Sequence, residues 1–176
     1  MHRFAVALIV IIVACAPCGA QKPLKSEASA DAVSVVGDHF SAAWAAGAGM
    51  QISELQLTDW AGSYSVGGTG HTPGLVIIRA NGRTYRGDRA QAPALEVVSR
   101  DDTGLQFSVV STPVSDAGEA CPLSLRREFR VFGEGAIFCD FELSLPAGAA
   151  PVQLEDVEVG MDLSTSELKH LRWCWK

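Results

Sequence analysis

Aromatic side chains beside polar loops are the residues of this sequence best suited to hold a ligand. The flat face of an aromatic ring can stack on the C–H face of a sugar, and a neighbouring arginine or aspartate can hydrogen-bond the hydroxyl groups. The set comprises Trp60, Tyr64, Tyr85, Arg86, Trp173 and Trp175, with Arg83 and Asp88 as further hydrogen-bonding groups. This chemistry predicts a carbohydrate-binding surface, and packing in a hydrophobic core is the alternative use of the tryptophans.

Catalytic motifs are not evident in the sequence. For His39, His71 and His170 the sequence identifies no partner, and a general base needs one within hydrogen-bond reach. The segment 66–71 is glycine-rich like a phosphate loop, but neither the lysine nor the helix of such a loop follows it. The cysteines after residue 20 lie too far apart along the chain for a metal-binding motif. We therefore expect no catalytic residue, metal or cofactor, and a binding module rather than an enzyme.

The first residues are typical of an export signal. His2 and Arg3 precede the apolar run Phe4–Ala14, which is shorter than the about 20 residues of a transmembrane helix. Small residues before Gln21 predict a signal peptide that spans residues 1–20. The alternative is a lipobox that ends at residue 14, after which Cys15 is lipidated and anchors the chain to a membrane. Both endings predict an exported protein of the bacterial periplasm, the outer envelope or the extracellular space.

The remainder of the chain is predicted to form one domain with a mildly acidic surface. Removing residues 1–20 from the 176-residue chain leaves 156 residues, enough for one hydrophobic core, and changes the formal net charge from −6 to −7. A surface of this sign argues against a nucleic-acid partner. The sequence contains no second long apolar run, so it predicts no transmembrane helix after the leader. Residues 21–31 are predicted to form a tether, and residues 32–176 the domain.

Alternating apolar and polar residues predict antiparallel hairpins. The clearest hairpin spans 123–145, with a turn at 133–135 that sets Val131 opposite Ile137 and Phe129 opposite Cys139. Asn81-Gly82 is typical of a type I′ turn and pairs Ile78 with Tyr85 and Arg79 with Thr84. A third hairpin joins 95–99 to 105–111, with Ser99 opposite Leu105.

Further strand signals lie at 33–44, 50–57 and 157–163, and one helical turn is predicted at 164–171. Turn signals every 8–12 residues are typical of an all-β sandwich or barrel. The fold class predicted is therefore an antiparallel β-sandwich built from successive hairpins after a signal segment. The segment 171–176 alternates like the start of another strand: either its tryptophans close the domain's own core with Cys174 facing outward, or the chain is a truncated product that lacks later strands.

Two residues of the 123–145 hairpin carry specific expectations. Cys139 lies on the apolar face and is predicted to be a buried thiol that Cys121 cannot reach. Because the number of cysteines after residue 20 is odd, at least one thiol is unpaired or forms an intermolecular bond. Arg127 lies at an inward position opposite Phe141. We expect this arginine either at the rim of the sheet or paired with a buried carboxylate.

The segments 39–44 and 47–55, HFSAAW and GAGMQISEL, resemble the opening of galactose-mutarotase-like β-supersandwich domains, and the later hairpins resemble their strands. Such domains occur as accessory modules of polysaccharide lyases and glycoside hydrolases. The resemblance implies carbohydrate binding, and it favours truncation because these domains are usually longer. The family's catalytic histidine and glutamate have no matching positions in this sequence.

These observations predict an exported, non-catalytic carbohydrate-binding or accessory β-sandwich module. The first alternative is a structural or interaction lipoprotein of the cell envelope, for which Cys15 is the lipidation site. The second is an N-terminal fragment of a glycoside hydrolase or polysaccharide lyase. The expected partner is a polysaccharide or another glycan, with membrane contact only through a lipid anchor.

Overall fold

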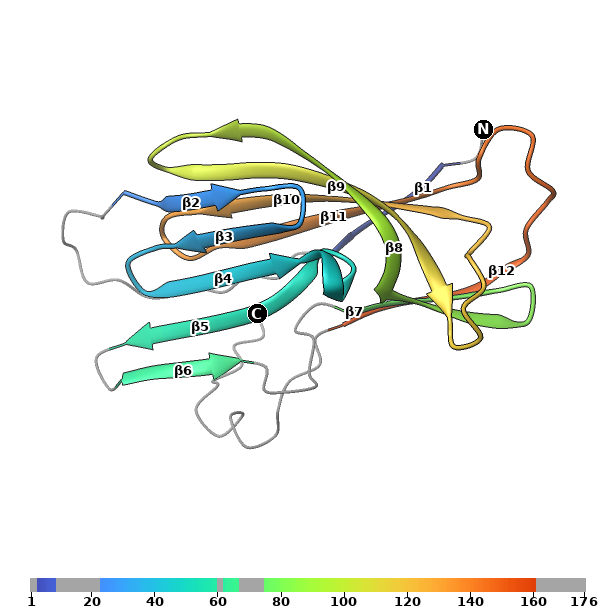
Figure 1. Ribbon diagram of the computed structural model, residues 1–176, viewed down its shortest axis with the longest axis horizontal. Helices are drawn as coiled ribbons and strands as arrows, with labels where there is room; N and C mark the ends of the chain where they lie inside the picture. Colours follow the sequence, from blue (N-terminus) through green and yellow to red (C-terminus); the bar gives the residue numbers. More distant parts are fainter. Residues whose placement is uncertain (1–2, 9–22, 60–61, 67–74, 161–176) are drawn as a thin grey trace.

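The protein is a β-sandwich of two antiparallel sheets, which face each other in Figure 1. The computed structural model describes residues 3–8, 23–59, 62–66 and 75–160. Over these ranges the chain forms strands and a single 3-10 turn, so the predicted all-β class and hairpin architecture are confirmed. The helical turn predicted at 164–171 and the strand predicted at 171–176 lie outside the described residues.

The smaller sheet has the strand order β2-β3-β4-β5-β6. Its strands are β2 (Lys25–Ala28), β3 (Ala32–Val36), β4 (Phe40–Ala45), β5 (Gln51–Asp59) and β6 (Gly62–Val66). The strand signal at 33–44 is divided by a turn, in which the Gly37 amide donates to the Phe40 carbonyl. His39, expected in a strand, therefore lies in this turn.

The larger sheet has the order β1-β11-β10-β9-β8-β7-β12. Its strands are β1 (Arg3–Leu8), β7 (Leu75–Ala80), β8 (Arg83–Arg100), β9 (Gly104–Ser115), β10 (Ser124–Phe132), β11 (Ile137–Ser144) and β12 (Leu154–Gly160). The long strand β8 curves strongly and carries the chain from the β7 and β12 end toward the part opposed to the smaller sheet (Figure 1).

The hairpin registers predicted from the sequence are largely confirmed. Phe129 lies opposite Cys139, and Ile78 lies opposite Tyr85, where Asn81 and Gly82 both adopt positive φ. In the third hairpin Val97 lies opposite Phe107 as the apolar pattern requires. Ser99, however, lies opposite Gln106 rather than Leu105, because a bulge after Val97 adds a residue to β8.

The N-terminal part of the described chain contributes two edge strands. Lys25–Ala28, within the segment predicted to be a tether, forms β2, and Leu24 is buried in the core, so the tether prediction is wrong for these residues. Leu24 is anchored because its amide donates to the Asp102 carbonyl at 2.9 Å. Arg3–Leu8, within the predicted leader, pairs with β11. The leader itself stays a prediction.

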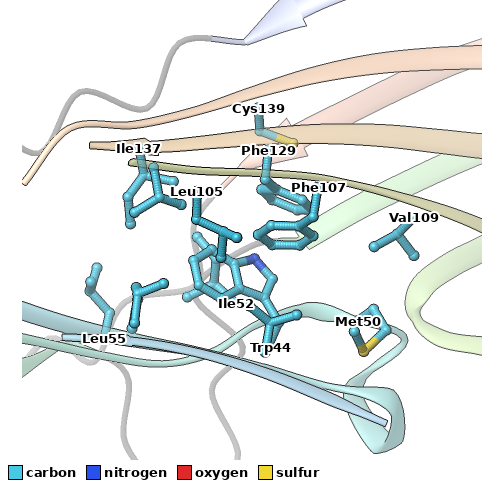
Figure 2. Packing of buried hydrophobic residues seen from close by; sticks show 14 of the residues in the cluster. Trp44, Met50, Ile52, Leu55, Leu105, Phe107, Val109, Phe129, Ile137 and Cys139 are labelled. Atoms are coloured by element: carbon cyan, nitrogen blue, oxygen red, sulfur yellow. The ribbon is translucent and has the colours of Figure 1, made fainter. Parts of the chain in front are cut away.

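The core consists of two hydrophobic clusters, of which the first joins the two sheets and the second lies within the larger sheet. In the first, Trp44 of the smaller sheet meets Phe107 and Phe129 of the larger sheet, as Figure 2 shows. The ring centroid of Trp44 lies 5.1 Å from that of Phe107, and the Phe107 and Phe129 rings stack at 4.9 Å. Each such pair contributes about 0.5–1.5 kcal/mol beyond its buried area. The second cluster lies under β7, β8, β10 and β11 and includes Ile78, Tyr85 and Leu125.

Candidate functional site

Tyr85 and Arg86 are neighbours on β8 and therefore project to opposite faces of the larger sheet. Tyr85 is 3% exposed and packs in the second hydrophobic cluster. The prediction that Tyr85 belongs to a sugar-stacking surface is therefore wrong, because a buried ring has no exposed face on which a ligand could stack. Arg86 projects to the outer face and remains a candidate binding residue.

Arg86 and Asp88 form a two-point ion pair on β8. The Arg86 Nε atom donates to Asp88 Oδ1 at 3.0 Å, and Nη2 donates to Oδ2 at 2.8 Å. The side chains are 33% and 15% exposed, respectively. Parallel hydrogen bonds of this kind fix both the position and the plane of a carboxylate. The pair therefore presents ordered donors and acceptors at a partly exposed place.

A second arginine lies on the same face between two carboxylates. Arg79 Nη1 lies 2.6 Å from Asp156 Oδ2 and 2.7 Å from Glu158 Oε1. The hydrogen bond with Glu158, followed by its charge, raises the pKa of Arg79 above its ordinary value. We define the arginine–carboxylate face as Arg79, Arg86, Asp88, Asp156 and Glu158.

The register of three strands sets the width of this face. Ile77 of β7 lies opposite Arg86 of β8 on one side and opposite Glu158 of β12 on the other. Directly opposed residues share a face, and neighbouring strands lie about 4.8 Å apart, so Arg86 and Glu158 flank Ile77 over about 10 Å. Ile77 is half-buried and supplies an apolar centre between the charged groups.

Two further ion pairs lie near this end of the sheet. Arg83 pairs with Glu119, and Arg89 pairs with Asp116, all through exposed side chains. Exposed pairs of this kind contribute about 0–1 kcal/mol to stability because water screens them. Arg83 is held by a single exposed pair, so it is a weaker candidate for ligand binding than Arg86, which Asp88 orders at two points.

Among the described residues, the remaining sequence-predicted binding residue, Tyr64, is not brought to this face. Tyr64 belongs to β6, where it pairs with Leu57 in the smaller sheet, whereas Tyr85 and Arg86 belong to the larger sheet. Outside the described residues lie Trp60, Trp173, Trp175 and the lipidation candidate Cys15. Among the described members of the predicted set, only Tyr85 and Arg86 share a strand.

Arg127 is buried between the two hydrophobic clusters and is 1% exposed. Its Nη2 atom donates to the Gly49 carbonyl at 2.5 Å and to Ser111 Oγ at 3.1 Å. The Nε and Nη1 atoms have no partner among the described residues. Neither expectation for this residue is met, because it lies away from the rim and no described carboxylate pairs with it. Burial lowers the pKa of Arg127 to about 10, so the guanidinium still carries its charge at neutral pH.

Gln51 lies near the same junction of the two sheets. It is 2% exposed, and neither polar atom of its amide has a partner in the described part of the chain. A Cβ atom built on Gly87 would lie 2.3 Å from Gln51 Nε2, so this glycine lets β8 pass close to the amide. The unpartnered atoms of Arg127 and Gln51 each expose less than 1 Å². We therefore interpret this polar junction as packed interior rather than as a binding site.

The described cysteines are buried free thiols. Cys139 is 5% exposed in the first cluster, which confirms its predicted core position, and it forms no bridge with Cys121, as predicted. Burial raises the pKa of the Cys139 thiol to about 12, although the Arg127 charge opposes the shift. Burial also raises the pKa of Cys121. A thiol that stays protonated is a poor nucleophile, so neither residue is suited to covalent chemistry.

Sequence reasoning identified Asp88 but missed the other two carboxylates of the arginine–carboxylate face, Asp156 and Glu158. The strand signal at 157–163 covers Glu158, but no local pattern indicates that β12 pairs with β7, nearly eighty residues earlier. The carboxylate of Glu155, which accepts a hydrogen bond from the Gly82 amide at 2.6 Å, was missed for the same reason.

Within the described ranges no group of three His, Cys, Asp or Glu residues is placed to hold a metal ion. None of the described helical structure is long and apolar enough to cross a membrane. A scan of protein-family models, a search of curated proteins and a search of solved structures each found no match. The assignment of a function therefore rests on the geometry of the chain itself.

Proposed function

We propose that this chain is an exported, non-catalytic β-sandwich module that binds a polysaccharide on its arginine–carboxylate face. The observation that carries the proposal is the two-point pair between Arg86 and Asp88 on β8. Groups that are ordered before a ligand arrives lose less conformational freedom when it binds. A sugar diol can accept from the guanidinium and donate to the carboxylate of such a pair.

The composition of the face favours a neutral sugar over an acidic one. It carries three carboxylates and two arginines, and each arginine is paired with at least one of these carboxylates. An acidic sugar would have to compete with Asp88, Asp156 and Glu158 for the same donors. Ile77 lies between the charged groups, where it can contact the apolar C–H face of a ring.

The resemblance to galactose-mutarotase-like domains supports the same class of ligand. Those domains act as accessory modules of carbohydrate-active enzymes, and the β-sandwich found for this chain is compatible with that resemblance. Trp60, Trp173 and Trp175 remain part of the proposal as stacking residues. Export through residues 1–20, with or without lipidation of Cys15, would place the module where polysaccharides occur.

Affinity electrophoresis and titration calorimetry with a panel of neutral and acidic polysaccharides test the proposal. Asp88→Asn should weaken binding at least tenfold, because it replaces one acceptor oxygen of the ordered pair with a donor. Arg130→Gln is the matched control: it removes a 2.8 Å ion pair with Asp140 that lies elsewhere on the same sheet. The proposal fails if no polysaccharide binds, or if both variants weaken binding equally.

A further inference from the structure

The edges of the described sheets are mostly protected against pairing with another strand. Strand β12 has a register shift between Leu154 and Asp156 and carries three exposed acidic residues. Strand β2 is four residues long and exposes Lys25 and Glu27. Short length, bulges and charges are the usual features that keep a sheet edge from recruiting foreign strands.

Strand β11 lacks the bulge and the short length that protect these edges. It pairs with β10 without a register shift from Ser124 opposite Ser144 to Val131 opposite Ile137. It is eight residues long and contains no proline. Its inward residues Ile137, Cys139 and Leu143 are buried, so one face of the strand is held against the core. Once exposed, such an edge is a good template for a further strand.

In this structure β11 already accepts a strand, β1. The register sets Phe4, Val6 and Leu8 opposite Leu143, Phe141 and Cys139, respectively. The alanines at 5 and 7 lie opposite Glu142 and Asp140. Large apolar residues of β1 thus oppose the inward positions of β11, and small residues oppose its acidic positions. The sequence of β1 therefore indicates which residue types can occupy the positions opposite β11.

Strand β1, Arg3–Leu8, lies inside the predicted leader. If the leader is removed, β11 loses this partner strand. We propose that residues Cys139–Ser144 of β11 form a strand-accepting edge. The N-terminal segment covers this edge in the precursor. After its removal the edge binds an extended segment of a partner protein, antiparallel, in which large apolar residues alternate with small ones. The interaction is strand addition through main-chain hydrogen bonds, with side-chain alternation as the source of selectivity.

A second copy of this chain is a poorer occupant of the edge. Twofold antiparallel pairing of β11 with itself about Phe141 would set Asp140 of each copy opposite Glu142 of the other. Pairing about Asp140 would set the two copies of that aspartate opposite each other. Like charges directly opposed across a strand pair are destabilising, which favours a partner with small or basic residues at these positions.

This edge is separate from the arginine–carboxylate face. Strand β12 is one end of the larger sheet, and β11 lies next to β1 at the other end, with β10, β9, β8 and β7 between β11 and β12. A partner strand on β11 therefore leaves the proposed polysaccharide surface uncovered. The two proposals share the predicted export leader, residues 1–20, but their binding measurements are separate.

The test begins with the full-length chain carrying a specific protease site after residue 20. After cutting, the fragment 1–20 should co-elute with the remaining chain in gel filtration, and excess peptide with the sequence of residues 3–8 flanked by lysines should displace it. When the fragment is removed, exchange should accelerate at least tenfold at those amides of residues 139–144 that point toward β1, and it should slow again when peptide is added, whereas the alternate amides that point toward β10 stay protected. The control peptide carries Val6→Pro, which removes a main-chain donor.

Three results would overturn the proposal: immediate loss of the fragment without faster exchange in β11, equal protection by both peptides, or protection that comes from dimerisation. The uncut chain with Val6→Pro provides a second measurement if the fragment-free chain does not fold. In that variant exchange should accelerate at 139–144, while the amides of Phe107 and Phe129 stay protected. Unchanged exchange in β11 would show that β1 does not cover the edge.

Discussion

Replacing Arg127 with methionine should leave the protein at least as stable as the wild type, although the arginine is almost completely buried. Burial disfavours the charge of Arg127 and lowers its pKa well below the ordinary value, to about 10. Each pKa unit corresponds to about 1.4 kcal/mol, so the charged guanidinium destabilises the folded state by about 3 kcal/mol. Methionine has a similar stem and removes this cost.

The opposing cost of Arg127→Met comes from the acceptors that lose their donor. The Gly49 carbonyl is buried and would be left without the 2.5 Å hydrogen bond from Nη2. An unsatisfied buried acceptor costs about 1–3 kcal/mol, whereas the Ser111 hydroxyl can rotate toward another partner. The free energy of unfolding should therefore lie between the wild-type value and about 2 kcal/mol above it.

The difference in the free energy of unfolding between the wild type and Arg127→Met should depend on pH, because burial has lowered the pKa of this arginine. Because the folded-state pKa is the lower one, the unfolded chain binds more protons between about pH 10 and 12.5, and wild-type stability rises with pH in that window. Between pH 8 and 11 the wild type should gain about 1 kcal/mol relative to Arg127→Met. Both proteins should also carry Cys139→Ala, because the charge of Arg127 acts on the Cys139 thiol and the titration of that thiol would complicate the comparison.

Urea unfolding followed by tryptophan fluorescence measures both quantities at pH 8 and pH 11. A loss of more than about 3 kcal/mol at pH 8 would mean that Arg127 is compensated by a group that the buried geometry does not supply. A stability difference that stays constant between the two pH values would refute the lowered pKa.

Three other outcomes are expected. Gly49→Ala should destabilise the protein more than Gly118→Ala in thermal unfolding. Both glycines have positive φ, but a Cβ atom at Gly49 would lie 2.0 Å from a backbone carbonyl oxygen, whereas one at Gly118 meets nothing within 4 Å. Cys121 and Cys139 should react with a thiol reagent at pH 8 at least 100-fold more slowly in the folded protein than in urea, and equal rates would contradict their burial. If the lipobox is used, metabolic palmitate labelling in a bacterial host should disappear in Cys15→Ser, and an unlabelled wild type would exclude the anchor.

Local patterns predicted the hairpins because their registers depend on residues that are close in sequence. Asn81-Gly82 specifies a two-residue turn, and alternation across 123–145 specifies which residues face the core. The same reasoning placed the Cys139 thiol in the core. It failed at Ser99, where a single-residue bulge changed the pairing without any change in the apolar pattern.

The candidate site was only partly predictable. Arg86 was identified as a hydrogen-bonding residue, but its neighbour Tyr85 was assigned to the same surface although alternation sends the two side chains to opposite faces. The acidic partners Asp156 and Glu158 are supplied by a strand that is distant in sequence. Pairing between distant strands depends on the whole sheet, so no local pattern identifies it.

By itself, the sequence determined the all-β class, the turns and the inward face of each hairpin, because period-two alternation and turn chemistry are local properties of the chain. Only the tertiary structure decided the order of the strands, the assembly of the arginine–carboxylate face and the surroundings of Arg127. Sequence placed this arginine on the inward face, and the fold alone set it between two hydrophobic clusters with the carbonyl of Gly49 as its acceptor. Burial and long-range pairing arise from the packing of all the strands together, so they cannot be determined from any one segment.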